Sequence, residues 1–266
     1  MNMGYRSTLA AVLAICALAA CSRDEAMAAP APAETAPMPA GGAVAETFEV
    51  TPISHATAVL HWADKVIYLD PVGGAEAFAG MDAPDLVLVT DIHGDHLSAD
   101  TLTAVVGDGT VIVAPQAVID QLPEPLAQRT TMLANGQSHT ERGFSIEAMP
   151  MYNLPESADA FHPKGRGNGY VIEREGLRIY VAGDTEDVPE MRALKDIDVA
   201  FIPMNLPYTM TVEDAADGVL AFAPKRVYPY HFRGTEGLSD VEKFKSLVNS
   251  GNPDIEVELL DWYSGT

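Results

Sequence analysis

The chain has 266 residues, of which 38 are acidic and 16 are basic, so its formal net charge is −22. This charge excludes nucleic acid as the expected partner, because the phosphates would be repelled. The length beyond an N-terminal segment of low complexity suits one domain with a sizeable core.

The first 20 residues predict an export signal. Arg6 supplies a positive charge, and residues 8–20 form an apolar stretch that is shorter than the roughly 20 residues of a membrane span. The stretch ends in small residues before Cys21, which resembles a bacterial lipoprotein signal whose Cys is diacylated and becomes the new N-terminus. We therefore expect a lipid on Cys21, with a plain secretory signal as the alternative. Because Ser22 and not Asp follows, the expected location is the periplasmic side of a bacterial outer membrane.

The mature domain is expected to contain no thiol, because Cys16 leaves with the signal and Cys21 carries the lipid. Any metal ligand must then come from His, Asp, Glu or Asn. Residues 21–45 are rich in Ala, Pro and Glu without apolar periodicity, so we expect a disordered tether there. The folded domain is predicted to span residues 46–266.

Strands dominate the start of this domain, and strands then alternate with helices. Alternation over residues 48–69 predicts two or three strands, among them 57–62 and 66–69. Apolar patterning predicts further strands at 85–90, 111–113, 145–149, 170–174, 177–182, 198–202, 226–230 and 255–260. Helices are predicted at 98–106 with Ser98 as N-cap, after Pro115, and at 187–194, 212–222 and 240–248. This order favours two sheets packed together with helices outside.

The densest group of polar side chains follows the buried strand at 85–90. Asp91, His93, Asp95 and His96 lie within six residues, and each can bind a metal ion. Asp91 and His93 could serve one ion, while Asp95 and His96 serve a second. Gly94 is expected to allow the tight turn that this division needs.

This stretch is similar to the His-x-His-x-Asp-His signature of the metallo-β-lactamase superfamily. Three further landmarks appear in the order of that superfamily: Asp70-Pro71 after a strand, Gly183-Asp184-Thr185 after another, and His231 after a third. The resemblance implies an α/β fold, a four-layer αβ/βα sandwich. It also implies that Asp184 bridges two metal ions, that His231 is the last ligand, and that Asp70 hydrogen-bonds a ligating His.

The sequence departs from the signature at two positions. Asp91 stands where the first His is usual, which favours harder ions and makes Mn²⁺ or Fe²⁺ alternatives to Zn²⁺. The third His, expected after the strand at 145–149, is missing, and either Asn153 or His162 could replace it. We expect one or two Zn²⁺ ions, with the site of Asp95, His96, Asp184 and His231 complete.

A closer resemblance is to the branch of lactonases and phosphodiesterases, based on His55-Ala56 ahead of Asp70-Pro71. It implies His55 as a pocket or catalytic residue; a strand His with a backbone partner is the alternative. Lys164 and Arg166 lie in a Gly-rich loop and could bind an anionic part of the substrate, or could belong to a solvated loop.

The resemblance implies a metal-dependent hydrolase in which a metal-bound hydroxide attacks a lactone, ester or phosphodiester of a small-molecule substrate. Asp95, Tyr208 or a metal-bound water could then give a proton to the leaving group. The alternative is a non-catalytic metal-binding or ligand-binding lipoprotein whose first site is degenerate. A β-lactamase with a Cys ligand is not expected, and a redox enzyme would need length for a flavin domain.

Overall fold

The structure, a computed structural model, describes residues 48–263. The expected export signal, the lipidation site Cys21 and the tether at 21–45 lie outside the described residues. Within residues 48–263, none of the helices combines the length and the apolar character that crossing a membrane requires.

The first sheet has six strands in chain order, β1 to β6. Strands β1 to β3 pair antiparallel, while β3 to β6 pair parallel. The strands are β1 (Phe48–Ser54), β2 (Thr57–Trp62), β3 (Lys65–Leu69), β4 (Leu86–Leu88), β5 (Val111–Ala114) and β6 (Thr130–Met132).

The second sheet has seven strands in the order β15-β12-β11-β10-β9-β8-β7. Its first four members pair parallel and the rest pair antiparallel. The strands are β7 (Ser138–Glu141), β8 (Phe144–Met151), β9 (Gly167–Arg174), β10 (Leu177–Val181), β11 (Val199–Pro203), β12 (Arg226–Tyr230) and β15 (Glu256–Val257). A separate small hairpin joins β13 (Arg233–Gly234) to β14 (Gly237–Leu238).

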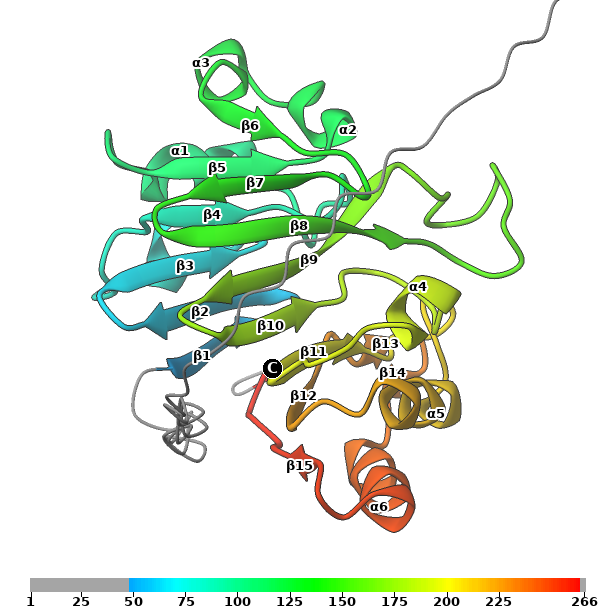
Figure 1. Cartoon of the computed structure of the whole chain (residues 1–266). Coiled ribbons are helices and arrows are strands. Elements are labelled where there is room, and N and C mark those ends of the chain that lie inside the picture. The colour runs from blue at the N-terminus through cyan, green and yellow to red at the C-terminus, as the bar shows by residue number, and fades with distance from the viewer. Residues whose placement is uncertain (1–47, 264–266) are drawn as a thin grey trace, which may run out of the picture. The chain divides into compact units, whose positions relative to one another are not determined.

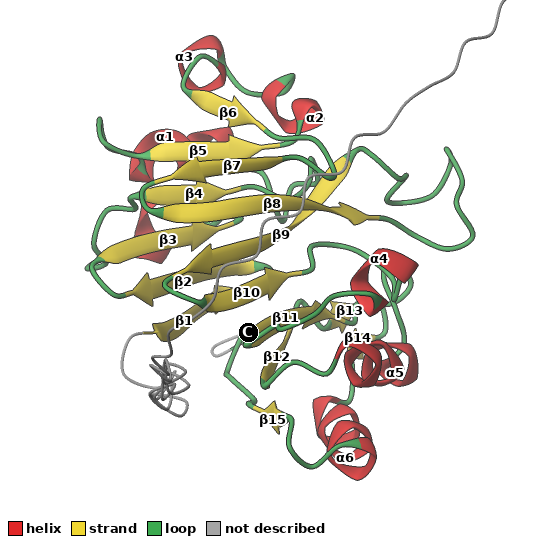
Figure 2. Ribbon diagram, viewed as in Figure 1, coloured by secondary structure: helices red, strands yellow, loops and turns green. Residues whose placement is uncertain are grey.

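Helices lie outside the two sheets (Figures 1 and 2). The first sheet carries the short helices and α1, which begins where the Ser98 hydroxyl accepts a hydrogen bond from the Thr101 N–H, as predicted. The second sheet carries α4, α5 and α6. The helices are η2 (Ala75–Phe78), α1 (Ala99–Val105), α2 (Gln116–Ile119), α3 (Glu124–Ala127), α4 (Pro189–Arg192), α5 (Val212–Phe222) and α6 (Val241–Gly251).

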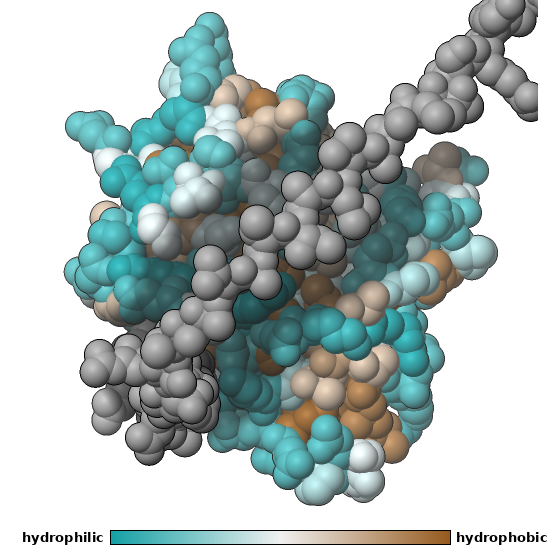
Figure 3. Space-filling model, viewed as in Figure 1, coloured by the Kyte–Doolittle hydropathy of each residue, from teal (hydrophilic) through white to brown (hydrophobic). Residues whose placement is uncertain are grey.

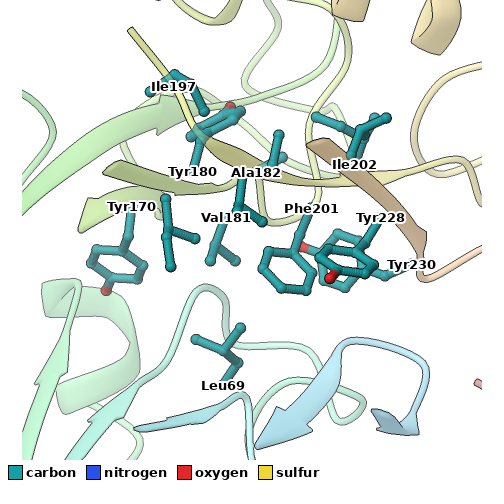
Figure 4. Packing of buried hydrophobic residues seen from close by; sticks show 14 of the residues in the cluster. Leu69, Tyr170, Tyr180, Val181, Ala182, Ile197, Phe201, Ile202, Tyr228 and Tyr230 are labelled. Carbon is teal, nitrogen blue, oxygen red and sulfur yellow. The ribbon is translucent and has the colours of Figure 1, made fainter. Parts of the chain in front are cut away.

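Alternation along the strands produces the layers. In Figure 4, Val181 and Phe201 point toward Leu69 of the first sheet, while Tyr180 lies on the opposite side of its strand. Tyr180 packs there against Phe222 of α5, with ring centroids 6.0 Å apart. The opposite face of the first sheet packs in the same way against α1, α2 and α3. The predicted four-layer αβ/βα sandwich is therefore confirmed.

The face of the molecule in Figure 3 is mainly hydrophilic, with an apolar patch in the region of α5 and α6. Several predicted elements are shorter or divided in the structure. The helix expected at 187–194 contracts to α4, the strands expected at 85–90 and 255–260 contract to β4 and β15, and the segment after Pro115 forms two helices. Strands β6 and β7 were not predicted, because their short polar sequences lack apolar alternation.

The carboxyl ends of four strands place the polar landmarks at one edge of the sandwich. Asp70 follows β3, Asp91 comes three residues after β4, Asp184 follows β10 and His231 follows β12. Strands β3 and β4 are parallel neighbours, and β10 and β12 are both parallel to β11, which lies between them. Parallel strands end at the same edge, which is where ligands bind in such sheets.

Candidate metal centre

The loop after β4 presents four polar side chains in two directions. The carbonyl of His93 accepts hydrogen bonds from the N–H groups of His96 and Leu97, which closes a tight turn. The expectation that Gly94 is needed for this turn is not supported. Its φ lies outside the left-handed region, and a Cβ added there would meet nothing within 4 Å.

Asp95, His96 and His231 form one group, which we call the second cluster. The Nε2 atoms of His96 and His231 are 3.1 Å apart, and His231 Nε2 lies 3.2 Å from Asp95 Oδ2. Asp184 completes the group: its Oδ2 is 3.2 Å from His96 Nε2, and its Oδ1 is 3.4 Å from His231 Nε2. All four side chains thus converge on one point.

Asp91, His93 and His162 form the first cluster. The His93 Nδ1 atom is 2.9 Å from Asp91 Oδ2, and His162 Nε2 is 3.9 Å from the same oxygen. His162 Nε2 also lies 3.2 Å from Asp184 Oδ2. Asp184 therefore lies between the two clusters, where a bridging carboxylate would lie.

The structure brings His162, and not Asn153, into the first cluster. Asn153 instead orients it: Asn153 Oδ1 accepts a hydrogen bond of 2.8 Å from the His162 N–H and is 3.2 Å from His162 Nδ1. The Asn153 amide donates to the carbonyl of Tyr208 at 2.8 Å. Asn153 is thus held by its own hydrogen bonds beside the ring that faces Asp184.

Asp70 contacts the Nδ1 atom of His96, whose Nε2 atom faces the second cluster. Its Oδ2 is 2.8 Å from His96 Nδ1 and accepts from the Thr90 hydroxyl, while its Oδ1 accepts from the Thr90 N–H at 2.7 Å. Full burial raises the pKa of Asp70 above its ordinary value. The carboxylate keeps the proton of His96 on Nδ1, which leaves the Nε2 lone pair for a metal ion.

The carboxylates that face the clusters are held ionised. Burial alone would raise the pKa of Asp184, but the neighbouring His231 and His96 hold it well below its usual range. In Asp95 the hydrogen bond from His231 and the charge of His96 likewise outweigh burial and lower the pKa. Ionised carboxylates beside imidazoles are a suitable donor set for a divalent cation.

The geometry fits a divalent cation. Ligand atoms about 2.0–2.2 Å from a tetrahedral ion are separated by roughly 3.3 Å. Four separations in the second cluster lie between 3.1 and 3.4 Å, and His96 Nε2 is 3.9 Å from Asp95 Oδ1. Among the described residues, His162 Nε2 and Asp184 Oδ1 are also buried without a hydrogen-bond partner. Buried polar atoms are rarely left so, and a cation would satisfy both.

A cavity of about 310 Å³ opens onto the clusters. Its wall contains ligand candidates from both of them, together with Phe161, Asn205 and Tyr208. Tyr208, a predicted proton donor, packs edge-on against Phe161, with ring centroids 5.1 Å apart. This volume is at the lower end of the range for small-molecule sites.

Lys164 and Arg166 were expected to bind an anionic part of the substrate, but both are paired with carboxylates. Lys164 Nζ lies 2.8 Å from Glu190 and 3.1 Å from Glu156. Arg166 donates two hydrogen bonds to Asp91, of 2.8 and 3.1 Å. Substrate binding by either residue remains a prediction that these pairings do not favour.

His55 lies behind the second cluster. Its carbonyl accepts the His231 N–H, and its ring meets the rings of His231 and Tyr263 edge-on, each at 5.2 Å. Burial and the nearby His231 lower the pKa of His55 to about 4, so the ring is neutral at pH 7. His55 and His231 both adopt positive φ, which costs free energy in residues other than Gly. A catalytic role for His55 remains a prediction.

Sequence reasoning missed the residues that fit strand β9 against the metal-binding loop. The Asn168 N–H donates to the Thr90 carbonyl at 2.9 Å, so the start of β9 approaches closely. A Cβ on Gly167 would lie 2.2 Å from Met151 Cε and 3.2 Å from Asp91 Oδ1. A glycine directly after Arg166 was the available signal, since Gly in a strand often marks a close approach.

Comparison with known proteins identifies relatives. Residues 49–231 match the family model described as beta-lactamase superfamily domain. A UPF0173 metal-dependent hydrolase of Thermococcus onnurineus is 34% identical over 193 residues, which cover 69% of this chain and 85% of that protein. The corresponding protein of Pyrococcus furiosus is 31% identical over 75% of this chain and 92% of its own length.

Two solved structures are similar to this chain. A metal-dependent hydrolase of Parabacteroides distasonis superposes with a TM-score of 0.72 at 36% identity and covers 81% of this chain and 94% of its own. The metallo-β-lactamase fold protein YhfI of Bacillus subtilis, 12% identical with a TM-score of 0.59 over 79% of this chain and 95% of its own, shares the fold. The matched family model and relatives, over a site that brings His and Asp ligands together, show that this chain belongs to the metallo-β-lactamase superfamily and is a metal-dependent hydrolase.

Proposed function

We propose that the protein hydrolyses an uncharged carboxylic ester or lactone. The observation that carries the proposal is the wall of the cavity, which among the described residues contains no lysine or arginine. The two nearby cations, Lys164 and Arg166, are engaged by carboxylates. Proteins that recognise phosphodiesters usually supply Arg or Lys to the anion. An uncharged carbonyl compound needs only neutral donors, and Asn205 and Tyr208 supply them.

Divalent cations bound at the clusters would supply a Lewis acid and lower the pKa of a coordinated water to about 7. The chain's own residues prepare the site for them. Asp184 stays ionised between the clusters, and Asp70 fixes the ring of His96. Asp95 is half-exposed at the cavity and held ionised, so it can accept a proton there, and the hydroxyl of Tyr208 is the donor that we assign to the leaving oxygen.

We propose Zn²⁺ as the ion, in one or both clusters. The second cluster combines two imidazoles with carboxylates, a ligand set common in catalytic zinc sites. The carboxylate of Asp91 in the first cluster makes Mn²⁺ and Fe²⁺ the alternatives. Metal analysis of the purified full chain distinguishes these ions directly.

A substrate panel tests the reaction. The metal-loaded full chain is given p-nitrophenyl acetate, γ-butyrolactone and bis(p-nitrophenyl) phosphate, and kcat/KM is measured for each. We expect the ester or lactone to be the best substrate, and His96→Ala and Asp184→Ala to abolish its hydrolysis. Tyr208→Phe should lower kcat by about 100-fold if the phenol is the proton donor.

His139→Ala is the matched control, because His139 lies on β7 outside both clusters, and its Nε2 is 3.6 Å from the half-buried Glu141. It should leave kcat/KM unchanged. Preferential hydrolysis of the phosphodiester would contradict the proposal and would keep the general hydrolase assignment.

We also propose that Cys21 anchors the protein to the cell envelope, on the sequence pattern alone. Cells that express the full chain would be fed a radiolabelled fatty acid, and the protein would be followed by fractionation. The label should enter the protein and be lost in Cys21→Ser, and the unmodified chain should leave the membrane fraction. Equal release of both proteins from the membrane would contradict the anchor.

A further inference from the structure

We propose that Arg166 makes the two metal positions unequal, so that the protein binds one divalent cation tightly in the second cluster and another weakly in the first. The proposal concerns metal binding by this chain's own residues and does not depend on the identity of the substrate.

Arg166 is a fixed cation of the first cluster. Its Nη2 and Nε atoms donate to the two oxygens of Asp91 at 2.8 and 3.1 Å, the geometry of a bidentate pair. The same Nη2 lies 3.4 Å from His93 Nε2. The Asp91 side chain is fully buried and that of Arg166 is only 20% exposed, so solvent screens this pair weakly.

The local backbone holds the guanidinium in this position. Gly167 directly follows Arg166, and the space where its Cβ would lie is filled by Met151 and by the loop of Asp91. The next residue, Asn168, is hydrogen-bonded through its N–H to the Thr90 carbonyl. The start of β9 is therefore held against the metal-binding loop directly after Arg166.

The two clusters differ in the negative charge that they offer to a cation. In the first cluster the single negative charge of Asp91 is already neutralised by Arg166, which leaves two imidazoles and a share of Asp184. The second cluster has the carboxylates of Asp95 and Asp184, whereas the guanidinium of Arg166 is paired with Asp91. A cation in the second cluster therefore meets more negative charge.

Electrostatic repulsion between Arg166 and a bound cation adds to the difference in affinity between the two clusters. An ion bound to Asp91 would lie about 4–5 Å from the guanidinium, and even at the dielectric constant of water this repulsion corresponds to about tenfold or more in a binding constant. Asp91 can still contribute through its outer lone pairs, so the first cluster keeps a weaker site.

Titration of the metal-free full chain with Zn²⁺ alone, by calorimetry and by dialysis with elemental analysis, tests the proposal. The wild type should bind one equivalent at least tenfold more tightly than the second. Arg166→Gln keeps a donor for Asp91 but removes the charge, so it should tighten the weaker site by about tenfold and leave the tighter site unchanged. Arg166→Lys keeps the charge and should keep the gap.

Arg174→Gln is the matched control. Arg174 lies at the other end of β9, pairs with Asp64 at 2.7 Å and is 16% exposed, so its replacement should leave both affinities unchanged. His93→Ala should remove only the weak equivalent.

Three outcomes would overturn the proposal: equal affinity of both equivalents in the wild type, weaker binding in Arg166→Gln, or the same change at both sites. The wild-type titration decides the first of these even if a variant does not fold.

Discussion

Asp70→Asn offers the sharpest test of how the second cluster is held. Asp70 Oδ1 faces the Thr90 N–H, which can only donate, so the oxygen of the new amide must take this place. The NH₂ group then takes the place of Oδ2, opposite the Thr90 hydroxyl and His96 Nδ1. The Thr90 hydroxyl can rotate and accept a hydrogen bond from this NH₂ group. His96 can accept only as the other tautomer, whose proton sits on Nε2 and blocks the metal ion.

The expected magnitude follows from this conflict. Either His96 changes tautomer, or one buried hydrogen bond is lost, at a cost of about 1–3 kcal/mol. A loss of that size corresponds to a roughly 10- to 100-fold change in a binding constant, which matches the usual effect of removing a partner behind a ligating His. We expect Asp70→Asn to weaken the tighter Zn²⁺ equivalent by this factor.

Competition with a zinc chelator measures the affinity, and urea unfolding of the metal-free protein measures stability. Asp198→Asn is the control, because Asp198 is also a buried carboxylate that accepts a backbone N–H, at 2.7 Å from Arg178, but it precedes β11 at the opposite edge. It should lower stability without weakening zinc binding. Unchanged zinc affinity in Asp70→Asn, or an equal loss in Asp198→Asn, would refute the reasoning.

Three further outcomes are expected. Asn153→Ala should weaken the Zn²⁺ equivalent of the first cluster and spare the other, as seen by calorimetry, because the ring that Asn153 orients is freed. Gly167→Ala should cost about 1–3 kcal/mol in urea unfolding, since its methyl would lie 2.2 Å from Met151 Cε, whereas Gly94→Ala should be tolerated. Burial raises the pKa of Tyr228 to about 12, above about 10 in the unfolded chain, so its hydroxyl stabilises the fold up to about pH 10 and this contribution is lost toward pH 12. The difference in unfolding free energy between wild type and Tyr228→Phe should shrink over that interval.

The predictable part of the site is the part written locally in the sequence. The buried strand before Asp91 and the spacing of His93, Asp95 and His96 fix one loop at a strand end, and periodicity alone finds that strand. Asp184 and His231 also follow apolar strands, and parallel pairing brings them to the same edge. The four layers follow from the same patterns.

The remaining features depend on contacts between distant segments. The choice between Asn153 and His162 depends on the path of the loop after β8. The loop returns so that the Asn153 N–H donates to the His162 carbonyl and the His162 N–H donates to Asn153 Oδ1. The partner of Arg166 is 75 residues away in sequence. The local sequence of either segment does not indicate such a pairing. The type of a side chain shows which groups it can bind, but not which groups the fold brings into contact with it.

The two departures from the superfamily signature fit a rearranged site better than a decayed one. An aspartate in place of the first His adds a buried negative charge, which would be costly alone. Arg166 neutralises that charge, and Gly167 leaves the room that the approach requires. His162 takes the place of the lost third His. Its buried Nε2 faces Asp184, while its Nδ1 lies beside Asn153 Oδ1. Decay would remove ligands without supplying partners for their replacements. Here each substituted ligand has a hydrogen-bonding partner that holds it in place, so the first cluster retains the organisation of a binding site.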